Sequence, residues 1–170
     1  MKKLAIVLLL LTLAYAPIFA QANLGVTVIA WPVGANISFN AYLWNITLPN
    51  DGVTSYQNDQ QGIMTVKSGS STNYQVNFSS QNLGYVKQGS YQIPYYVYVS
   101  QLTTGHIGII GTPAITVGYV QLTSTQSIPF NKKTPTGGIQ FYVGFKLDAT
   151  GEFFYSGGYT DNLIVEFVAL

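Results

Sequence analysis

The sequence has no cysteine, no arginine and a single histidine. Without cysteine, no disulfide framework can stabilise the fold. Charged residues make up 8% of the chain and the formal net charge is +1, whereas charged residues make up about 25% of an ordinary globular domain. A near-neutral chain without arginine has no electrostatic surface for nucleic acid or for an anionic membrane. The composition therefore excludes a nucleic-acid partner.

Low charge is not accompanied by low hydrophobicity. Hydrophobic residues make up 48% of the chain and aromatic residues 14%, with 13 tyrosines, which is far from the composition of a disordered chain. The polar remainder is mostly Ser, Thr, Asn, Gln and Gly. Such a surface has little net charge to keep copies apart. We therefore expect a packed domain with a tendency to associate with itself.

Residues 1–22 have the features of a secretory signal peptide. Lys2-Lys3 form a basic start, residues 4–14 are apolar, and Ala20-Gln21-Ala22 matches the A-x-A cleavage pattern. Cleavage after Ala20 is the close alternative. The apolar core is shorter than the ~20 residues that span a bilayer, so we expect export with cleavage rather than a membrane anchor. The mature chain, 23–170, is then expected to be one domain without stable membrane insertion.

Alternation of apolar and polar residues recurs along the mature chain, and no stretch has a convincing helical period. Pro94 cannot donate a ladder hydrogen bond, so its strand is expected at a sheet edge or bulged there. About eight strands separated by short polar turns favour an all-β, immunoglobulin-like sandwich. The predicted strands are 24–31, 37–48, 62–67, 73–80, 91–102, 114–122, 139–147 and 161–170.

Candidate catalytic groups are few. His106 lies in a Gly-rich segment with no cysteine and no second histidine in the chain. A catalytic triad, a cysteine nucleophile or a zinc site would each need partners that the sequence lacks. We therefore expect His106 to be a solvated loop residue, and we expect no cofactor and no metal.

The six carboxylates do not form an evident catalytic pair either. Three of them lie in turn contexts, where Asp commonly accepts hydrogen bonds from the backbone: Asp51, Asp59 and Asp148. Glu166 falls on the solvent-facing parity of its strand. One alternative is a glycosidase pair, since two carboxyls from distant strands could meet. The other is a calcium site at 50–51 with 58–59, whose spacing matches no known loop pattern. We predict that the protein is not an enzyme.

Three Asn-x-Ser/Thr sequons are present, at Asn36, Asn45 and Asn77. Asn77 lies on the polar parity of its predicted strand, where a glycan would be tolerated. These asparagines are possible glycosylation sites in a host that glycosylates exported proteins.

Three segments carry a resemblance to a known family: Gly157-Gly158-Tyr159-Thr160-Asp161-Asn162-Leu163, the Tyr-rich stretch 89–99, and the strand–turn–strand pattern of 65–80. The similarity in the order of the strands extends over most of residues 24–170. The chain resembles the spore coat protein U family, which is related to subunits of chaperone–usher pili, as a cysteine-free member.

The resemblance implies an incomplete sandwich with an apolar groove flanked by the first and last strands. In such pilins a periplasmic chaperone fills the groove first, and the N-terminal segment of a neighbouring subunit then replaces it, which is donor-strand complementation. An outer-membrane usher is the further partner that the resemblance implies. The groove-lining residues of the last strand would be Leu163, Val165, Phe167 and Ala169, which share one parity.

The start of the mature chain has the alternation of a donor strand. Leu24, Val26, Val28 and Ala30 share one face, and Gly25 is small enough for a close backbone approach. The alternative is that this segment is simply the domain's own first strand. Both interpretations are open at the level of the sequence.

The sequence therefore predicts an exported structural subunit of a pilus, fibre or coat. It would pass through the periplasm to the cell surface and bind other copies or related pilin subunits. The alternative is a secreted, monomeric carbohydrate-binding or adhesin module. In that case Trp31, Trp44 and the tyrosines would offer stacking surfaces for sugars.

Overall fold

The computed structural model describes residues 21–31, 36–69, 71–105, 107–151 and 153–170. Nearly all regular structure in these residues is β-strand, which confirms the predicted all-β class. The elements are β1 (Gln21–Trp31), β2 (Ile37–Phe39), β3 (Leu43–Pro49), β4 (Tyr56–Val66), β5 (Tyr74–Ser80), β6 (Tyr85–Gln88), β7 (Tyr91–Gln101), the short 3₁₀-helix η1 (Ala114–Thr116), β8 (Gln126–Phe130), β9 (Ile139–Leu147) and β10 (Gly157–Ala169).

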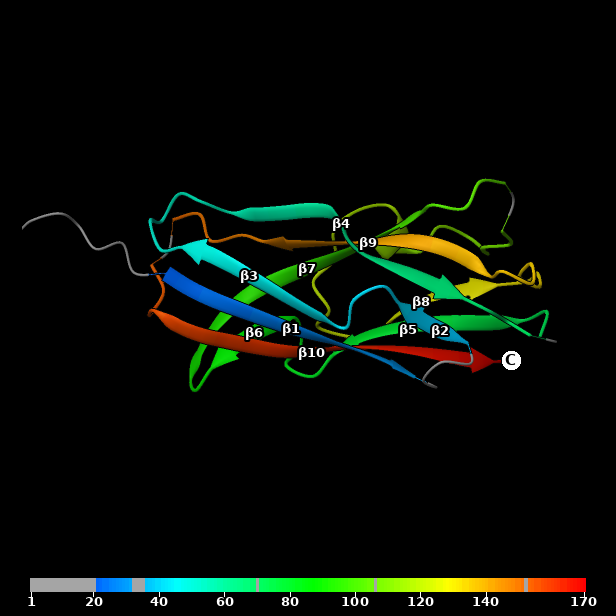
Figure 1. The fold of residues 1–170 in the computed structure, drawn as a ribbon, viewed down its shortest axis with the longest axis horizontal. Coiled ribbons are helices and arrows are strands. Elements are labelled where there is room, and N and C mark those ends of the chain that lie inside the picture. Colours follow the sequence, from blue (N-terminus) through cyan, green and yellow to red (C-terminus); the bar gives the residue numbers. More distant parts are fainter. Residues whose placement is uncertain (1–20, 32–35, 70, 106, 152) are drawn as a thin grey trace, which may run out of the picture.

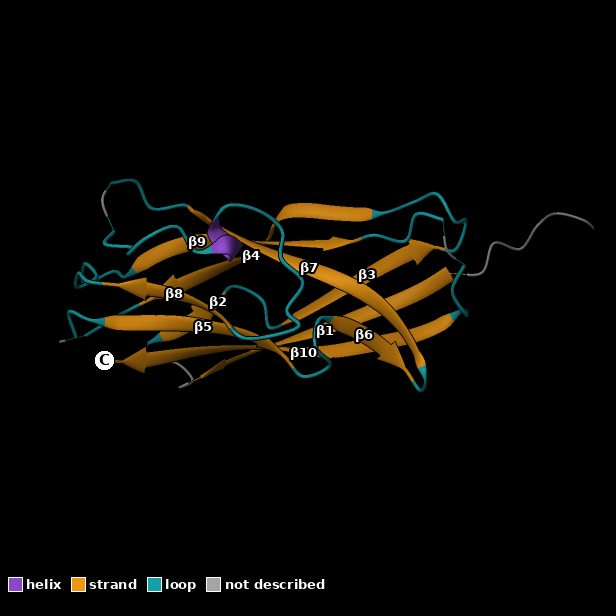
Figure 2. Ribbon diagram, turned by 180° about the vertical axis from the view of Figure 1, so that it is seen from behind, coloured by secondary structure: helices purple, strands orange, loops and turns teal. Residues whose placement is uncertain are grey.

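The strands form one continuous, curled sheet in the order β2-β4-β9-β7-β6-β10-β1-β3, with β5 branching from β10 and β8 pairing with β5. Figure 1 shows β1 between β3 and β10 along one side of the molecule. Figure 2 shows β6 and β7 from behind, with η1 beside β7. The immunoglobulin-like arrangement stays a prediction, because the described strands form a single curled sheet.

Strand β7 connects the two halves of this sheet. Its first residues, Tyr91–Pro94, pair with β6, and its remaining residues, Tyr95–Gln101, pair with β9. The change of partner occurs at Pro94, where the sequence predicted an edge or a bulge. A proline has no N–H to donate to a ladder, so this is a position at which one ladder can end and another begin.

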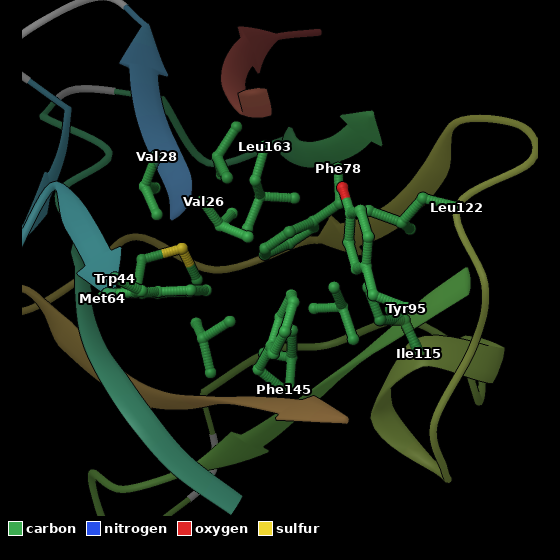
Figure 3. Packing of buried hydrophobic residues seen from close by; sticks show 14 of the residues in the cluster. Val26, Val28, Trp44, Met64, Phe78, Tyr95, Ile115, Leu122, Phe145 and Leu163 are labelled. Carbon is green, nitrogen blue, oxygen red and sulfur yellow. The ribbon is translucent and has the colours of Figure 1, made fainter. Parts of the chain in front are cut away.

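The core lies inside the curl and consists of alternate residues of the strands. In β5 the pattern is strict, with every second residue from Tyr74 to Ser80 buried, and β9 follows a similar pattern. Figure 3 shows Val26, Phe78, Tyr95, Phe145 and Leu163 pointing into one interior. The buried apolar side chains form a single cluster, so each face-alternating strand contributes one face to a shared core.

Two predicted strands are wrong in detail. The segment 37–48 is split into β2 and β3, which lie at opposite ends of the strand order. The break is at Asn40, whose backbone N–H donates to Ile63 O and whose side chain accepts from Ile63 N. A side chain that bonds to a neighbouring strand's backbone in this way interrupts the regular ladder.

The predicted strand 114–122 is instead η1 followed by an irregular segment. Pro113 precedes the helix, and the Thr116 hydroxyl donates to Pro113 O at 2.8 Å, which favours a turn over an extended strand. The backbone of this segment pairs with β7 at an isolated bridge, between Val120 and Val97. The alternation of apolar and polar residues in 114–122 therefore does not correspond to a strand.

The predictions also missed β6, β8 and the first half of β4. Residues 57–61 read as polar and turn-like but belong to β4, which has a register irregularity between Asn58 and Gly62. The polar first half of β4 lacks the apolar alternation on which strand prediction depends.

Residues 1–20, His106 and Glu152 lie outside the described residues, so the predictions made for the signal peptide and for His106 stay predictions. Strand β1 begins at Gln21, and Ala22 is 1% exposed. Cleavage after Ala22 would remove the first two residues of this strand, whereas cleavage after Ala20 would keep them.

Candidate functional site

The first strand, β1, is paired along both edges. It runs parallel to β10 from Ala22 opposite Gly157 to Trp31 opposite Glu166. It runs antiparallel to β3 from Gln21 opposite Pro49 to Thr27 opposite Leu43. Among the strands that the structure describes, β1 and β10 form the parallel pair. We call the position between β3 and β10 the β1 slot.

The inward face of β1 closes this side of the core. Leu24, Val26 and Val28 are at most 2% exposed, and Figure 3 shows Val26 and Val28 pointing into the interior beside Leu163. This confirms the predicted alternation for those three residues. Ala22 continues the face toward the start of the strand. Ala30 pairs with Val165 in the ladder, but its side chain lies outside the described part of the chain.

The outward face of β1 is polar except at Ile29, and it is partly hollow. Asn23 accepts a hydrogen bond from the Thr47 hydroxyl of β3 at 3.3 Å. A shallow depression of about 270 Å³ lies over Gly25, between β3 and β10, with Gly158 at its margin. Gly25 has only Thr160 Cγ2 within 4 Å of the place where a side chain would begin. The slot therefore holds its strand through the inward side chains and the two ladders.

The last strand, β10, lines the slot over most of the predicted face. Leu163 and Val165 are fully buried, and Phe167 is partly buried, with its ring stacked on Tyr74 at a centroid distance of 5.1 Å. The prediction for Ala169 is wrong, since Ala169 is exposed. The reason is that the β1 ladder ends at Glu166, so the end of β10 extends beyond the part of the core that β1 covers.

In this structure the chain's own first strand fills the β1 slot, whose walls are β3 and β10. Because β1 pairs directly with β10, no open groove lies between the first and last described strands. The groove that the resemblance implied stays a prediction. Of the two interpretations of residues 24–30, the structure shows the segment in its own domain.

The other side of β10 is held by antiparallel ladders and by a buried carboxylate. Residues Leu163–Ala169 pair with β5, and Thr160 pairs with Lys87 of β6. Asp161, which is 4% exposed, accepts hydrogen bonds from the Ser80 hydroxyl at 2.7 Å, the Tyr95 hydroxyl at 2.6 Å and the Asn82 backbone N–H at 2.9 Å. We call these residues the Asp161 cluster. It connects β10 to β5 and β7.

Sequence reasoning missed the Asp161 cluster. Asp161 and Tyr159 share the parity of Leu163 and Val165, and that parity is the signal that could have placed both in the core. Tyr159 is fully buried and its hydroxyl donates to Tyr155 O at 3.0 Å. Burial, together with the nearby Asp161 carboxylate, raises the pKa of Tyr95 well above its ordinary value. Tyr95 therefore stays protonated and donates to Asp161.

The other carboxylates have structural roles or face solvent. Asp51 accepts from the hydroxyl and the backbone N–H of Thr54 and from Val53 N, and these bonds, led by the Thr54 hydroxyl, lower the pKa of Asp51 to about 2. Asp148 caps Thr150 N and pairs with Lys146 at 3.4 Å. Glu166 is exposed, as its parity indicated.

Asp59 corrects one prediction, because it lies within β4 rather than in a turn. It accepts from Gln57 and from the Tyr119 hydroxyl, and the Tyr119 bond is the main cause that lowers its pKa. Within the described residues, no group of three or more acidic, His or Cys side chains is arranged to hold a metal. Likewise, no helix in this part of the chain has the length and apolarity needed to cross a membrane.

The three sequon asparagines differ in their surroundings. Asn45 is exposed on β3. Asn77 accepts from the Ser127 hydroxyl at 2.7 Å, and the Asn36 side chain donates to Lys67 O at 2.7 Å. Asn45 is thus the sequon with the most accessible side chain, and glycosylation stays a prediction.

One proposed stacking surface for sugars is wrong. Trp44 is 2% exposed and packs edge-on against Phe145 at a centroid distance of 5.9 Å. The side chain of Trp31 lies outside the described part. The carbohydrate-binding alternative would therefore depend on exposed tyrosines.

A scan against protein-family models finds no match, and a search of the curated proteins finds no significant relative. The resemblance to spore coat protein U consequently stays a prediction that depends on the motifs in this sequence.

Proposed function

We propose that this protein is an exported structural subunit of an extracellular fibre or coat, and that copies are joined by exchange of β1. The observation that supports this proposal is the position of β1 between β3 and β10, with its inward side chains buried in the core. A strand in this position can come from the same chain or from a neighbouring copy, because both would present the same side chains.

The connectivity of the sheet makes β1 the separable strand. It precedes the other described strands and is joined to them through residues 32–35. Without β1, each described strand except β3 still has a strand partner. Removal of β1 would uncover an apolar groove between β3 and β10, which is the kind of surface that invites strand addition.

The side chains of β1 are large enough to make a durable joint. Burial of Leu24, Val26 and Val28 at about 1.5–3 kcal/mol each contributes about 5–9 kcal/mol before the costs of ordering. Two ladders add hydrogen bonds along the length of the strand. The low charge of the chain leaves little repulsion between copies.

Chaperone and usher partners belong to the same proposal. A groove without its strand would expose apolar surface, so a periplasmic chaperone that covers it during export would prevent aggregation. The chaperone-bound subunit would pass from the periplasm to the cell surface. The form with β1 in its own slot would be a subunit that has not exchanged its strand.

The proposal is tested with a variant that lacks residues 21–31. We expect this variant to fold only when a synthetic peptide of residues 21–31 is added, as followed by circular dichroism. A matched peptide with Leu24→Ser and Val26→Ser keeps the length but loses the apolar face, and it should not restore folding. A variant that folds cooperatively without any peptide would contradict the proposal.

Assembly itself is tested on the exported protein at high concentration. Strand exchange predicts a ladder of species on a denaturing gel without boiling, and its collapse to a single band after boiling. A single band before boiling, together with no filaments by electron microscopy, would show that β1 stays in its own domain.

A further inference from the structure

Two tyrosines that lie far apart in the sequence are in direct contact at the end of the molecule where β1 begins. Tyr91 opens β7 in the β6–β7 hairpin, and Tyr155 lies in the segment that leads into β10. Their ring centroids are 4.1 Å apart with an interplanar angle of 34°. They are 45% and 63% exposed, respectively.

The neighbouring Tyr155 phenol is the main cause that raises the pKa of Tyr91. With ring centroids 4.1 Å apart, the carbons of one ring lie close to those of the other, so the ortho positions next to the two hydroxyls can meet. These carbons and the phenolic oxygen share the unpaired electron when a tyrosine loses a hydrogen atom.

The supporting structure holds the backbone of each tyrosine. Tyr91 is paired with Gln88 in the hairpin ladder, and the Tyr155 carbonyl accepts from the buried Tyr159 hydroxyl at 3.0 Å. The two backbones are thus held in place, and both side chains are exposed. This is the arrangement that favours coupling within one chain over coupling between chains, because the second ring is always at hand.

We propose that Tyr91 and Tyr155 form a dityrosine cross-link when the protein is oxidised by hydrogen peroxide and a haem peroxidase. Each phenol loses one electron and one proton to give a tyrosyl radical. The two radicals join through a carbon–carbon bond between their ortho positions, and both rings regain aromaticity by moving the ortho hydrogens to the oxygens. One peroxide accepts the two electrons and two protons and yields two waters.

A second tyrosine pair serves as an internal control. Tyr98 and Tyr119 have ring centroids 5.6 Å apart at 45°, and the Tyr119 hydroxyl donates to Asp59 at 2.7 Å. The Tyr119 hydroxyl is thus directed to the Asp59 carboxylate rather than to the Tyr98 phenol. We expect this pair not to couple under conditions in which Tyr91 and Tyr155 do.

The cross-link would give this cysteine-free chain a covalent closure between the β6–β7 hairpin and the start of β10. Such a closure constrains the unfolded chain in the way that a disulfide does. The inference does not depend on strand exchange, since both tyrosines belong to one chain and neither lies in the β1 slot.

The test treats the purified, dilute protein with hydrogen peroxide and peroxidase and follows dityrosine fluorescence. Tryptic mass spectrometry should show one linked pair of peptides, containing Tyr91 and Tyr155, that has lost two hydrogen atoms. Tyr91→Phe should abolish this product, whereas Tyr98→Phe should leave it unchanged. The oxidised protein should also unfold at a higher urea concentration than the untreated protein.

Three results would overturn the proposal. They are no dityrosine at all, coupling only between chains, or a main product that links Tyr98 to Tyr119. Circular dichroism of both variants before oxidation shows whether they are folded. Tyr155→Phe provides a further variant, which removes the other tyrosine of the pair and should also abolish the product.

Discussion

The two sides of β10 differ in how their neighbours are attached. On one side, β5 and β6 pair with β10 in antiparallel ladders, and Asp161 adds hydrogen bonds to Ser80, Asn82 and Tyr95. On the other side, β1 pairs in parallel and its inward face is apolar. Parallel pairing is slightly less stable per residue than antiparallel pairing.

The neighbours on the β5 side of β10 are held by specific hydrogen-bond donors, whereas the neighbour on the β1 side is held by an alternation of apolar side chains that another strand could also supply. The β5 side needs particular donors at particular positions, because the Asp161 carboxylate is costly to bury without them. The β1 side needs a strand of the right alternation, whichever molecule supplies it. We therefore expect changes on the β1 side to be correctable by an added strand, and changes on the β5 side not to be.

The largest effects come from a matched pair of core truncations. Phe78→Ala in β5 should lower the free energy of unfolding by about 3–5 kcal/mol, and Leu24→Ala in β1 by about 2–5 kcal/mol. An excess of the peptide of residues 21–31 should raise the urea midpoint of the Leu24 variant, since the intact strand can replace the truncated one. It should leave the Phe78 variant unchanged. Equal responses of the two variants would remove the distinction between the sides.

The next effect concerns the Asp161 cluster. Asp161→Asn keeps the shape but replaces one acceptor oxygen with a donor. Either the oxygen that accepts from the Ser80 and Tyr95 hydroxyls or the oxygen that accepts from the Asn82 N–H is therefore lost. We expect a loss of about 1–3 kcal/mol in the free energy of unfolding. Glu166→Gln, on the exposed face of the same strand, is the control and should change stability by less than about 0.5 kcal/mol.

A smaller effect is expected at the start of β1. A chain that begins at Asn23 lacks Gln21 and Ala22, and Ala22 is buried opposite Gly157 and Leu48. The loss of one buried methyl group and the adjoining ladder bonds should cost about 1 kcal/mol. Urea unfolding of the two chain lengths measures the difference, and identical midpoints would show that the first two residues of β1 contribute nothing.

The smallest effect at neutral pH is expected for Tyr74→Phe on the β5 side. The Tyr74 hydroxyl is buried and without a hydrogen-bond partner, so its removal should be neutral or stabilise by less than about 1 kcal/mol. The ring still stacks between Phe130 and Phe167. A loss of more than this amount would mean that the hydroxyl has a partner in solution.

At high pH the same substitution should matter more. Burial raises the pKa of Tyr74 from 10.0 to about 12. As the pH rises, the unfolded chain therefore loses this proton before the folded chain does. The contribution that the neutral form of Tyr74 makes to the free energy of unfolding is complete below pH 10 and is lost as the pH rises through 12. The Phe variant should lose less stability than the original protein between pH 10 and 12. Urea midpoints across this pH range provide the measurement.

The fold class was predictable because the core strands alternate strictly. Segments such as 73–80 and 139–147 correspond closely to β5 and β9, since their apolar faces meet one shared core. The polar half of β4 and the short β6 gave no such signal. The break at Asn40 depends on a hydrogen bond to Ile63, more than twenty residues away in sequence, and local patterns cannot indicate a partner at that distance.

The candidate site was predictable in part for the same reason. Alternation was sufficient to place Leu24, Val26 and Val28 on one inward face, and to place Leu163 and Val165 on the facing strand. It was not sufficient for Ala169, because the end of the β1 ladder is set by register. It also could not show that β3, rather than β1, forms the wall of the slot, since this depends on the order of strands in space.

The two walls of the β1 slot run in opposite directions, because β1 is parallel to β10 and antiparallel to β3. Any strand that enters the slot, in either direction, therefore forms one parallel and one antiparallel ladder. Since reversal only exchanges the two types of ladder, the backbone provides little preference for direction. The polarity of a chain of such subunits would then be decided by side chains, above all by where a small residue such as Ala22 or Gly25 meets the walls.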